Sequence, residues 1–578
     1  MKNTILFLWF VCFYTMITAQ TIQSPNGKLA LTFALTAGGE PTYSLSFANK
    51  AVVQASKLGL ELKDAPAFLN GFTIVRVDST SKDETWQPVW GEVKNIRNQY
   101  KELAVTLQQS AANNRQLVLR FRVFDDGLGF RYEFPRQDAL SYFTIMDEKT
   151  EFQLTGNHKA FWIPGDYDTN EYAYSTTALS EVNALRGRNA NEISTRTIIA
   201  DNAVQTPLML KSADGLYINI HEAALVNYPA MHLLVNKQNY RLTAQLAPSA
   251  VGDKALMQTP GTTPWRTIVV SDKATDILAS KLILNLNEPN KIQDVSWIKP
   301  IKYVGIWWEM HVDKATWSYA TGGNLKLADT DWKKLQPSGK HGATTENTKR
   351  YIDFAAKHGL GGVLIEGWNV GWEDWFGNWK EEVFDFVTPY PDFNVEELSR
   401  YAASKGVQLI MHHETSASAT NYERRMDAAF QFMKKYGYNS VKTGYVGRII
   451  PRGEFHDGQW MINHYNRVIA KAADYKIMVD AHEPVRPTGL HRTYPNLLAC
   501  EAARGNEFNA WSEGNPPDHE TILPFTRLMG GPMDYTPGIF EIKRSYYQPE
   551  RKEQVHTTLT KQLALYVTMY SPLQMAAD

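Results

Sequence analysis

The chain has little cysteine and no excess of charge of either sign. Its 578 residues include two cysteines, Cys12 and Cys500, and 60 basic residues stand against 61 acidic ones. Cys12 lies in an N-terminal segment that we expect to be removed, so Cys500 has no partner for an intramolecular disulfide. The formal charge of −1 gives no global field that would attract a polyanion. Nucleic acid is therefore not expected as a partner.

Long apolar runs are missing except at the start of the chain. Lys2 precedes an apolar run of about a dozen residues, and the small residue Ala19 follows it. This pattern is typical of a cleaved secretory signal, predicted over residues 1–20. The run is shorter than the roughly 20 residues that a membrane-spanning helix needs, and we expect no membrane span. An exported protein without a disulfide is more typical of bacteria than of an animal secretory pathway, so we expect this protein in a bacterial periplasm or at the cell surface.

Aromatic residues are abundant: 16 Trp, 28 Tyr and 25 Phe. Their flat faces suit pyranose ligands as well as large β cores. A hydrophobic fraction of 43% with 21% charged residues excludes wholesale disorder, and the length predicts two to four domains.

The pattern of apolar and polar residues changes once along the chain. Residues 21–290 run in short alternating segments such as LALTFAL, QLVLRFRVF and LYINIHEA, which predict an antiparallel β-sandwich. Residues 291–300 are a predicted linker. Over 301–578, short apolar runs such as GGVLIEGW and KIMVDAHE alternate with amphipathic segments of helical length. This alternation predicts a parallel sheet, and we expect a (β/α)8 barrel in which LALYVTMY forms a late strand.

Acidic and imidazole side chains stand where the predicted barrel strands end. They are Glu366, His412, His413, Glu414, His482, Glu483 and Glu501, with Glu507 six residues further on. Because the carboxyl ends of parallel strands meet at one rim, these side chains should converge. Buried like charges are costly unless protons, a cation or a substrate compensates, so the pattern indicates catalysis or a metal site. Taken singly, each strand-end glutamate is more typical of a surface or capping residue, and His412 and His413 are compatible with core packing.

Paired carboxylates beside aromatic residues fit glycosidic cleavage, which needs one protonated acid and one ionised partner. The sequence has no Walker phosphate loop, no dinucleotide-binding glycine pattern after a first strand and no GxSxG elbow. A zinc hydrolase is the rival, because histidines at strand ends can hold zinc. Acids outnumber imidazoles, which favours a hard ion such as Ca²⁺. A non-catalytic glycan-binding protein also stays open.

Two long strings carry a family resemblance. IMHHETSASATNYERRMDAAF and VDAHEPVRPTGLHRTYPNLLACEAARGNEFNAW resemble glycoside hydrolase family 97, and within it the inverting α-glucosidases of starch-utilisation systems. The resemblance spans nearly the whole chain, including GDYDTNEYAYSTTALSE. It implies an N-terminal β-super-sandwich, a (β/α)8 barrel and a small C-terminal β-domain that this chain would lack. It also implies a Ca²⁺ ion in the active site and an oligosaccharide substrate.

The resemblance also assigns roles to residues. It implies that Glu507 is the general acid and that Glu414 and Glu483 hold and deprotonate water. It implies that Glu171, Glu483 and Glu501 ligate calcium, with Glu507 close to the ion. Glu181 and Glu192 are alternatives to Glu171. We assign substrate binding to Glu366, His412, His413, His482 and Trp308, and place Asp480 behind His482 because both lie on one side of their strand.

One position bears on stereochemistry. Retaining members of the family, which include α-galactosidases, carry an aspartate nucleophile at the end of the fourth barrel strand, where this chain reads VKTGYVG with Gly444. The resemblance therefore implies inversion, with acid and base carboxyls roughly 6.5–9.5 Å apart. A related α-glycosidase with another sugar preference, such as an α-galactosidase, remains the alternative. Monomer and dimer are both open.

Overall fold

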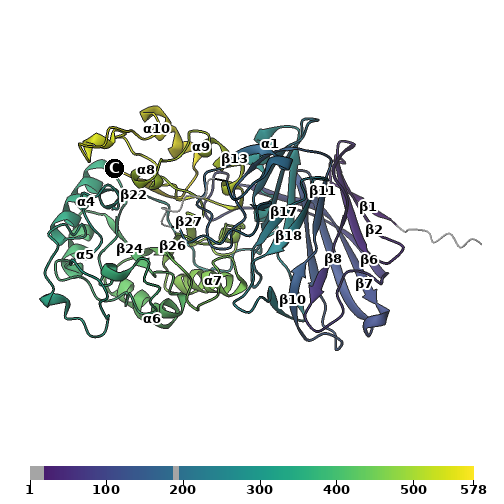
Figure 1. Ribbon diagram of the computed structural model, residues 1–578, viewed down its shortest axis with the longest axis horizontal. Helices are drawn as coiled ribbons and strands as arrows, with labels where there is room; N and C mark the ends of the chain where they lie inside the picture. The colour runs from purple at the N-terminus through teal and green to yellow at the C-terminus, as the bar shows by residue number, and fades with distance from the viewer. Residues whose placement is uncertain (1–18, 187–193) are drawn as a thin grey trace, which may run out of the picture.

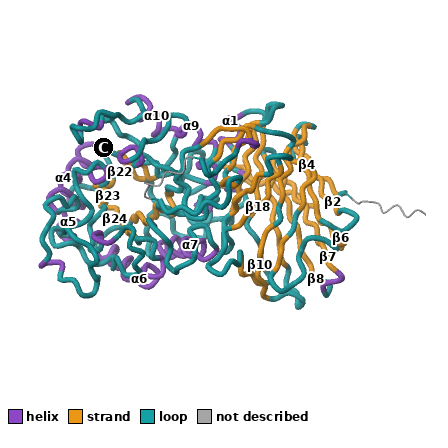
Figure 2. Tube along the Cα trace, viewed as in Figure 1, coloured by secondary structure: helices purple, strands orange, loops and turns teal. Residues whose placement is uncertain are grey.

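The computed structural model describes residues 19–186 and 194–578, and two halves lie side by side along its long axis (Figure 1). The predicted signal peptide, with Cys12, falls outside the described residues apart from its last two positions. Glu192 also falls outside them. Strands dominate the N-terminal half, and helices surround the strands of the C-terminal half (Figure 2).

The N-terminal half contains two large antiparallel sheets. The first sheet runs, in spatial order, through β1 (Gln20–Gln23), β2 (Leu29–Leu35), β3 (Pro41–Phe47), β4 (Lys50–Lys57), β11 (Glu151–Leu154), β18 (Arg241–Leu246), β17 (Met231–Val235) and β14 (Ala203–Gln205). The second runs through β13 (Ser175–Ala178), β12 (Lys159–Trp162), β15 (Leu208–Lys211), β16 (Tyr217–Ala223), β21 (Trp265–Ser271), β9 (Gly127–Phe134), β8 (Arg115–Phe124), β7 (Ile96–Gln109) and β6 (Phe72–Trp86), with β20 (Gly261–Thr262) beside β9. A small third sheet joins β19 (Ala255–Gln258), β10 (Tyr142–Glu148) and β5 (Leu60–Leu62).

The two large sheets face each other across an aromatic core. Strand β3 buries every second residue, as period-two alternation requires. The ring of Phe33 on β2 lies 5.9 Å from that of Phe121 on β8, and the ring of Tyr43 lies 5.0 Å from that of Phe130 on β9. The predicted β-sandwich is confirmed.

Two short helices connect the halves. Helices α1 (Ala274–Ala279) and α2 (Leu282–Asn285) follow β21 and pack against β16, and the first barrel strand, β22 (Ile301–Ile306), comes after them. The predicted domain boundaries at 290 and 300 stay a prediction; both numbers fall between α2 and β22.

The C-terminal half is a nearly closed barrel of parallel strands. Among the described residues its sheet has seven strands, in the order β27 (Leu497–Cys500), β26 (Met478–Ala481), β25 (Ser440–Gly444), β24 (Gln408–Glu414), β23 (Gly362–Ile365), β22 and β28 (Leu573–Ala576). Met533 forms a parallel bridge to Cys500 and donates its backbone N–H to the carbonyl of Tyr570. The segment around Met533 therefore occupies the gap between β27 and β28, and the predicted fold class is confirmed.

Amphipathic helices cover the barrel. They are α3 (Trp308–His311), α4 (Thr345–His358), α5 (Val395–Ser404), α6 (Ala419–Lys435), α7 (Gln459–Asp474), α8 (Phe508–Trp511), α9 (His519–Ile522) and α10 (Leu559–Thr568). Helix α4 shows why such segments are helical: the Thr344 side chain caps its first turn by accepting the N–H of Asn347, and Gly359 ends it at φ 68°. Within the described ranges, the helices are too short or too polar to span a lipid bilayer.

One sequence prediction of secondary structure is wrong. The segment LALYVTMY was expected to be a strand, but most of it belongs to α10. The side chain of Thr558 accepts the N–H of Lys561 and caps the helix, and the last barrel strand is β28, where Leu573 and Met575 are buried. A purely apolar run does not distinguish strand from helix by its period.

A buried arginine joins the two halves. Arg486, which follows β26, is 2% exposed. Its Nη1 lies 2.6 Å from an oxygen of Asp457, and it donates to side-chain oxygens of Asn170 and Gln205 in the N-terminal half. The carbonyl of Met231 accepts from Nη2. These bonds fix the N-terminal half against the loops at the carboxyl ends of the barrel strands.

Replacing this arginine should loosen the joint. We expect Arg486→Met to lower the free energy of unfolding by about 3–5 kcal/mol, because it leaves the buried Asp457 carboxylate without its cation. Urea-induced unfolding followed by tryptophan fluorescence measures the change. Arg400→Met, which removes an exposed ion pair with Glu396, should change the value by less than about 0.5 kcal/mol. Equal effects of the two substitutions would contradict this role of Arg486.

Candidate active site

The strand-end side chains predicted from the sequence converge on one pocket. Its volume is about 890 Å³, including the part open to solvent, and its lining includes Glu366, His412, Glu414, His482, Glu483, Glu501 and Glu507. Glu171 reaches the same pocket from the N-terminal half. These carboxylates are less than a tenth exposed, except for the half-buried Glu483.

Glu414 and Glu483 are held by consecutive backbone amides. Tyr445 donates its N–H to Oε2 of Glu483 at 2.7 Å, and Val446 donates its N–H to Oε1 of Glu414 at 3.2 Å. Glu483 adopts a φ of 51°, an unfavourable conformation for a residue with a side chain that is typical of functional sites. Burial raises the pKa of Glu414 to about 7. Burial, reinforced by Glu501 and Glu414, raises the pKa of Glu483 well above its ordinary value.

Gly444 leaves the space that the Glu414 carboxylate occupies. Strand β25 ends at Gly444, where the paired strand β24 ends at Glu414. A Cβ atom added to Gly444 would collide with Oε2 of Glu414. A side chain at position 444 and this placement of Glu414 therefore exclude each other.

Glu171, Glu501 and Glu507 form an acidic cluster. One oxygen from each of the three carboxylates lies within 4.8 Å of the others, and all three residues are buried. Glu171 lies in a loop of the N-terminal half, where Thr169 and Ser194 donate hydrogen bonds to its Oε2. Of the candidates near Glu171, Glu181 instead bonds the backbone of Ala178.

The loop that carries Glu171 is fixed by Asp166. Oδ1 of Asp166 accepts the backbone N–H groups of Asp168, Thr169 and Thr197 at 2.8–3.2 Å, and Oδ2 accepts the hydroxyl of Tyr172 at 2.8 Å. A bonded loop of this kind keeps the Glu171 carboxylate in one place. The N-terminal half is therefore part of the site.

The acidic cluster fits a hard cation. Burial, Glu501 and Glu171 raise the pKa of Glu507 well above its ordinary value, and burial with the nearby Glu501 raises the pKa of Glu171 to about 7. Oε1 of Glu507 is buried, and none of the described residues hydrogen-bonds it. Protons or a cation must therefore offset the charge here. An oxygen-only donor set suits Ca²⁺ better than zinc.

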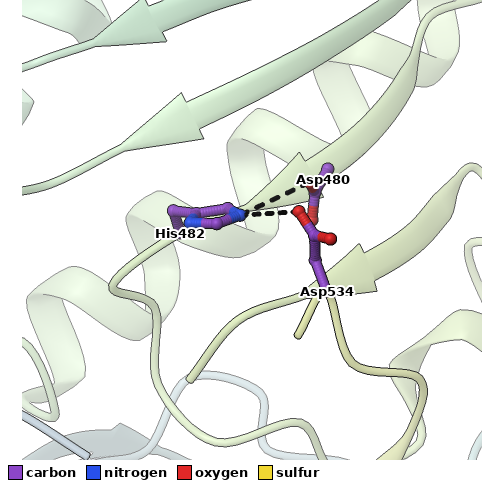
Figure 3. Close-up of side chains that lie close together, drawn as sticks. All are labelled: Asp480, His482 and Asp534. Carbon is purple, nitrogen blue, oxygen red and sulfur yellow. Dashed lines mark hydrogen bonds and ion pairs between the residues drawn. The ribbon is translucent and has the colours of Figure 1, made fainter. Parts of the chain in front are cut away.

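His482 faces two aspartates, Asp480 and Asp534, on one side of its ring (Figure 3) and Glu501 of the acidic cluster on the other. Its Nδ1 is 3.4 Å from an oxygen of Glu501, and its Nε2 is 2.9 Å from Asp534 and 3.5 Å from Asp480. Burial and Lys442 oppose protonation, but Glu501 and Asp480 raise the pKa of His482 well above its ordinary value. Asp480 was expected behind His482 and is found there. Asp534 was missed, because the GGPMDYTPG segment around it has no strand pattern.

Glu366 is bound on both carboxylate oxygens. Lys442 donates to Oε1 and the Trp317 indole donates to Oε2, each at 2.8 Å. Burial opposes ionisation of Glu366, but Lys442 and His412 lower its pKa to about 2. Lys442 was missed in the sequence, although a lysine two residues before Gly444 in an apolar strand must share its face.

Two predicted substrate contacts lie outside the pocket. Trp308 donates its indole N–H to the hydroxyl of Tyr547 at 3.1 Å, and Trp307 lines the pocket in its place. The reason is that α3 begins at Trp308, so its ring turns away from the rim. His413 points outward, as strand alternation requires, and shares a hydrogen bond with Tyr422. Trp317, Trp372 and Trp375 complete the aromatic wall, and sequence reasoning had not singled them out.

Comparison with known proteins adds family evidence. The model described as "Glycosyl-hydrolase 97 N-terminal" matches residues 22–289, and "Glycoside hydrolase 97" matches residues 307–503. A solved family 97 enzyme from Pseudoalteromonas sp. strain K8, in complex with acarbose, is 42% identical with a TM-score of 0.85, covering 97% of this chain and 80% of its own. A variant of that enzyme in complex with panose gives the same values. A curated retaining alpha-galactosidase from Bacteroides thetaiotaomicron is 26% identical over 100% of this chain and 82% of its own length.

The bound state of Glu366 predicts a pH-dependent contribution to stability. Its folded pKa of about 2 lies below the ordinary 4.5, so the ionised form stabilises the fold above pH 4.5 and this contribution is lost as the pH falls toward 2. We expect Glu366→Gln to lower the free energy of unfolding by about 3 kcal/mol at pH 6, and by less at pH 3.5.

Chemical denaturation of both proteins at the two pH values measures this difference. Glu396→Gln, which removes an exposed helical ion pair with Arg400, serves as the control and should cost less than about 0.5 kcal/mol. A penalty for Glu366→Gln that stays constant between pH 6 and pH 3.5 would show that the carboxylate is not held ionised by Lys442.

Proposed function

The chain belongs to glycoside hydrolase family 97, and on that premise we propose that it is a calcium-dependent, inverting exo-α-glucosidase. Its substrates would be malto-oligosaccharides and related α-glucosides, cleaved at the non-reducing end. One observation carries the proposal: Gly444 has no side chain that could act as a nucleophile, and the Glu414 carboxylate occupies the space beside it. The backbone N–H groups of Tyr445 and Val446, which follow Gly444, bind Glu483 and Glu414.

The proposed reaction needs a proton donor and a water-activating pair. Glu507 suits the donor, because burial and two neighbouring carboxylates raise its pKa and, in the described part of the chain, no group hydrogen-bonds its Oε1. It would protonate the leaving glycosidic oxygen. Glu414 and Glu483 would orient a water molecule and remove its proton as the water attacks the anomeric carbon. A single displacement of this kind inverts the configuration of an α-glucoside to β-glucose.

The proposed cation is Ca²⁺. Glu171, Glu501 and Glu507 offer converging oxygens, and Glu483 lies with Glu501 and His482 in an adjoining group. When bound, Ca²⁺ would offset the negative charge of these carboxylates and polarise neighbouring oxygens. The donor set supports a hard ion, and the zinc hydrolase considered from the sequence has no matching set of nitrogen or sulfur donors in this cluster.

Glucose is the proposed sugar. The solved relative at 42% identity is in complex with acarbose and, as a variant, with panose, and both ligands are built from α-linked glucose-like rings. The alternative is an α-galactosidase, which the curated relative at 26% identity favours. That relative is named as retaining, whereas a retaining mechanism needs a carboxylate nucleophile that Gly444 does not supply.

We place the enzyme in the periplasm, where the predicted signal peptide would deliver it. Oligosaccharides entering that compartment would be its substrates.

A substrate panel tests the proposal. We expect the full chain with Ca²⁺ to hydrolyse aryl α-glucosides far faster than aryl α-galactosides, to lose activity with a chelator, and to release β-glucose first, as seen by proton NMR. Glu507→Gln should lower kcat at least about 1,000-fold on natural oligosaccharides, whereas Glu513→Gln, an exposed neighbour, should not.

Each failure has its own meaning. Initial release of α-glucose would contradict inversion, and faster cleavage of α-galactosides would contradict the sugar assignment. Activity that persists in the presence of a chelator would contradict the proposed dependence on Ca²⁺.

Position 444 provides a second test. We expect Gly444→Ala to lower kcat at least about 100-fold, because the added methyl group displaces the Glu414 carboxylate from its place. Gly38→Ala is the matched control, since its added Cβ would approach nothing closer than 3.9 Å. If Gly444→Ala turns over substrate at the wild-type rate, Glu414 does not orient or deprotonate the attacking water.

A further inference from the structure

His482 has carboxylates at both of its ring nitrogens. Asp534 lies 2.9 Å from Nε2, and Glu501 lies 3.4 Å from Nδ1 on the opposite side of the ring. Asp480 approaches Nε2 at 3.5 Å (Figure 3). All four residues are 5% exposed or less. The imidazole therefore connects a pair of buried aspartates to a carboxylate of the acidic cluster.

Asp534 is anchored independently of the acidic cluster. It lies in the segment that closes the barrel, and its backbone N–H bonds the carbonyl of Cys500 at 2.9 Å. The Tyr303 hydroxyl donates to Oδ2 of Asp534 at 3.0 Å, the same oxygen that faces His482. These two contacts hold Asp534 in place independently of its contact with the imidazole.

Glu501 needs such a fixed partner. It follows the end of β27, and besides His482 its carboxylate accepts the backbone N–H of Glu483 at 3.2 Å. Repulsion from Glu171 and Glu507, which crowd the same space, would otherwise turn it away. Groups that orient a metal ligand from behind are known to affect metal affinity strongly.

We infer that Asp534, supported by Asp480, is a positioning residue that orients His482 so that its Nδ1 fixes Glu501 as a ligand of the cation. This inference rests on the cation site of the proposed function. Asp480, His482 and Asp534 could also be considered as a metal site of their own, since their ligand atoms lie within 4.8 Å. However, Nε2 of His482 lies 2.9 Å from Oδ2 of Asp534 and donates to that carboxylate, so this nitrogen carries a proton and has no lone pair for a metal.

Calorimetric titration of the chelator-treated full chain with CaCl₂ tests the inference. We expect one Ca²⁺ per wild-type chain, and an affinity about 10–100-fold weaker for Asp534→Asn at the same stoichiometry. Asp480→Asn should weaken binding in the same direction, and it takes the place of Asp534→Asn if that variant does not fold. Asp392→Asn is the matched control, because Asp392 contacts His341 at 2.9 Å while the other nitrogen of His341 bonds a backbone carbonyl. Its affinity should equal that of the wild type.

The outcomes distinguish a failure of the positioning role of Asp534 from a failure of the proposed cation site. Wild-type affinity in Asp534→Asn and Asp480→Asn would overturn the positioning role while leaving the cation site intact. Two ions per wild-type chain and one per Asp534→Asn chain would make the aspartates ligands, and this too would overturn the positioning role. A wild-type chain that takes up no Ca²⁺ would overturn the cation proposal itself, and the inference with it.

Discussion

Repulsion among buried carboxylates is the constraint on which the rest of this site depends. Six glutamates from both halves of the molecule line one pocket, and three of them bring oxygens within 4.8 Å of one another. Such crowding persists only if each negative charge is neutralised, bonded or protonated. The chain supplies Lys442, the His482 imidazolium and a set of backbone amides, and it leaves the acidic cluster for a proton or a cation to complete.

These partners give identical side chains different states. Glu366, paired with Lys442, has a pKa lowered to about 2 despite its burial. For Glu507, burial and repulsion from Glu501 and Glu171 raise the pKa instead. Glu414 accepts backbone N–H groups and lies between these extremes, with burial raising its pKa to about 7. Carboxyl groups whose pKa values differ in this way can act one as the acid and another as the base.

The sequence predicted the rim well because its signals are local. Apolar strands that end in acids and alternate with amphipathic helices locate Glu366, Glu414, Glu483 and Glu501, and the barrel geometry brings them together. The errors arise where local pattern does not determine orientation. Trp307 and Trp308 differ only in which of them follows the strand directly, and LALYVTMY fits either a strand or a helix. Asp534 lies in a segment whose role in closing the barrel comes only from tertiary contacts. The roles of the site residues themselves stay predictions.

The central claim is that these carboxylates surround one hard cation. A crystal structure of the Ca²⁺-loaded chain, with anomalous scattering to identify the ion, tests it most directly. The account predicts a single Ca²⁺ with oxygens of Glu171, Glu483 and Glu501 about 2.3–2.6 Å away and the Glu507 carboxyl beside it. Density that shows no ion there, with the glutamates paired only to protein groups or turned apart, would contradict it.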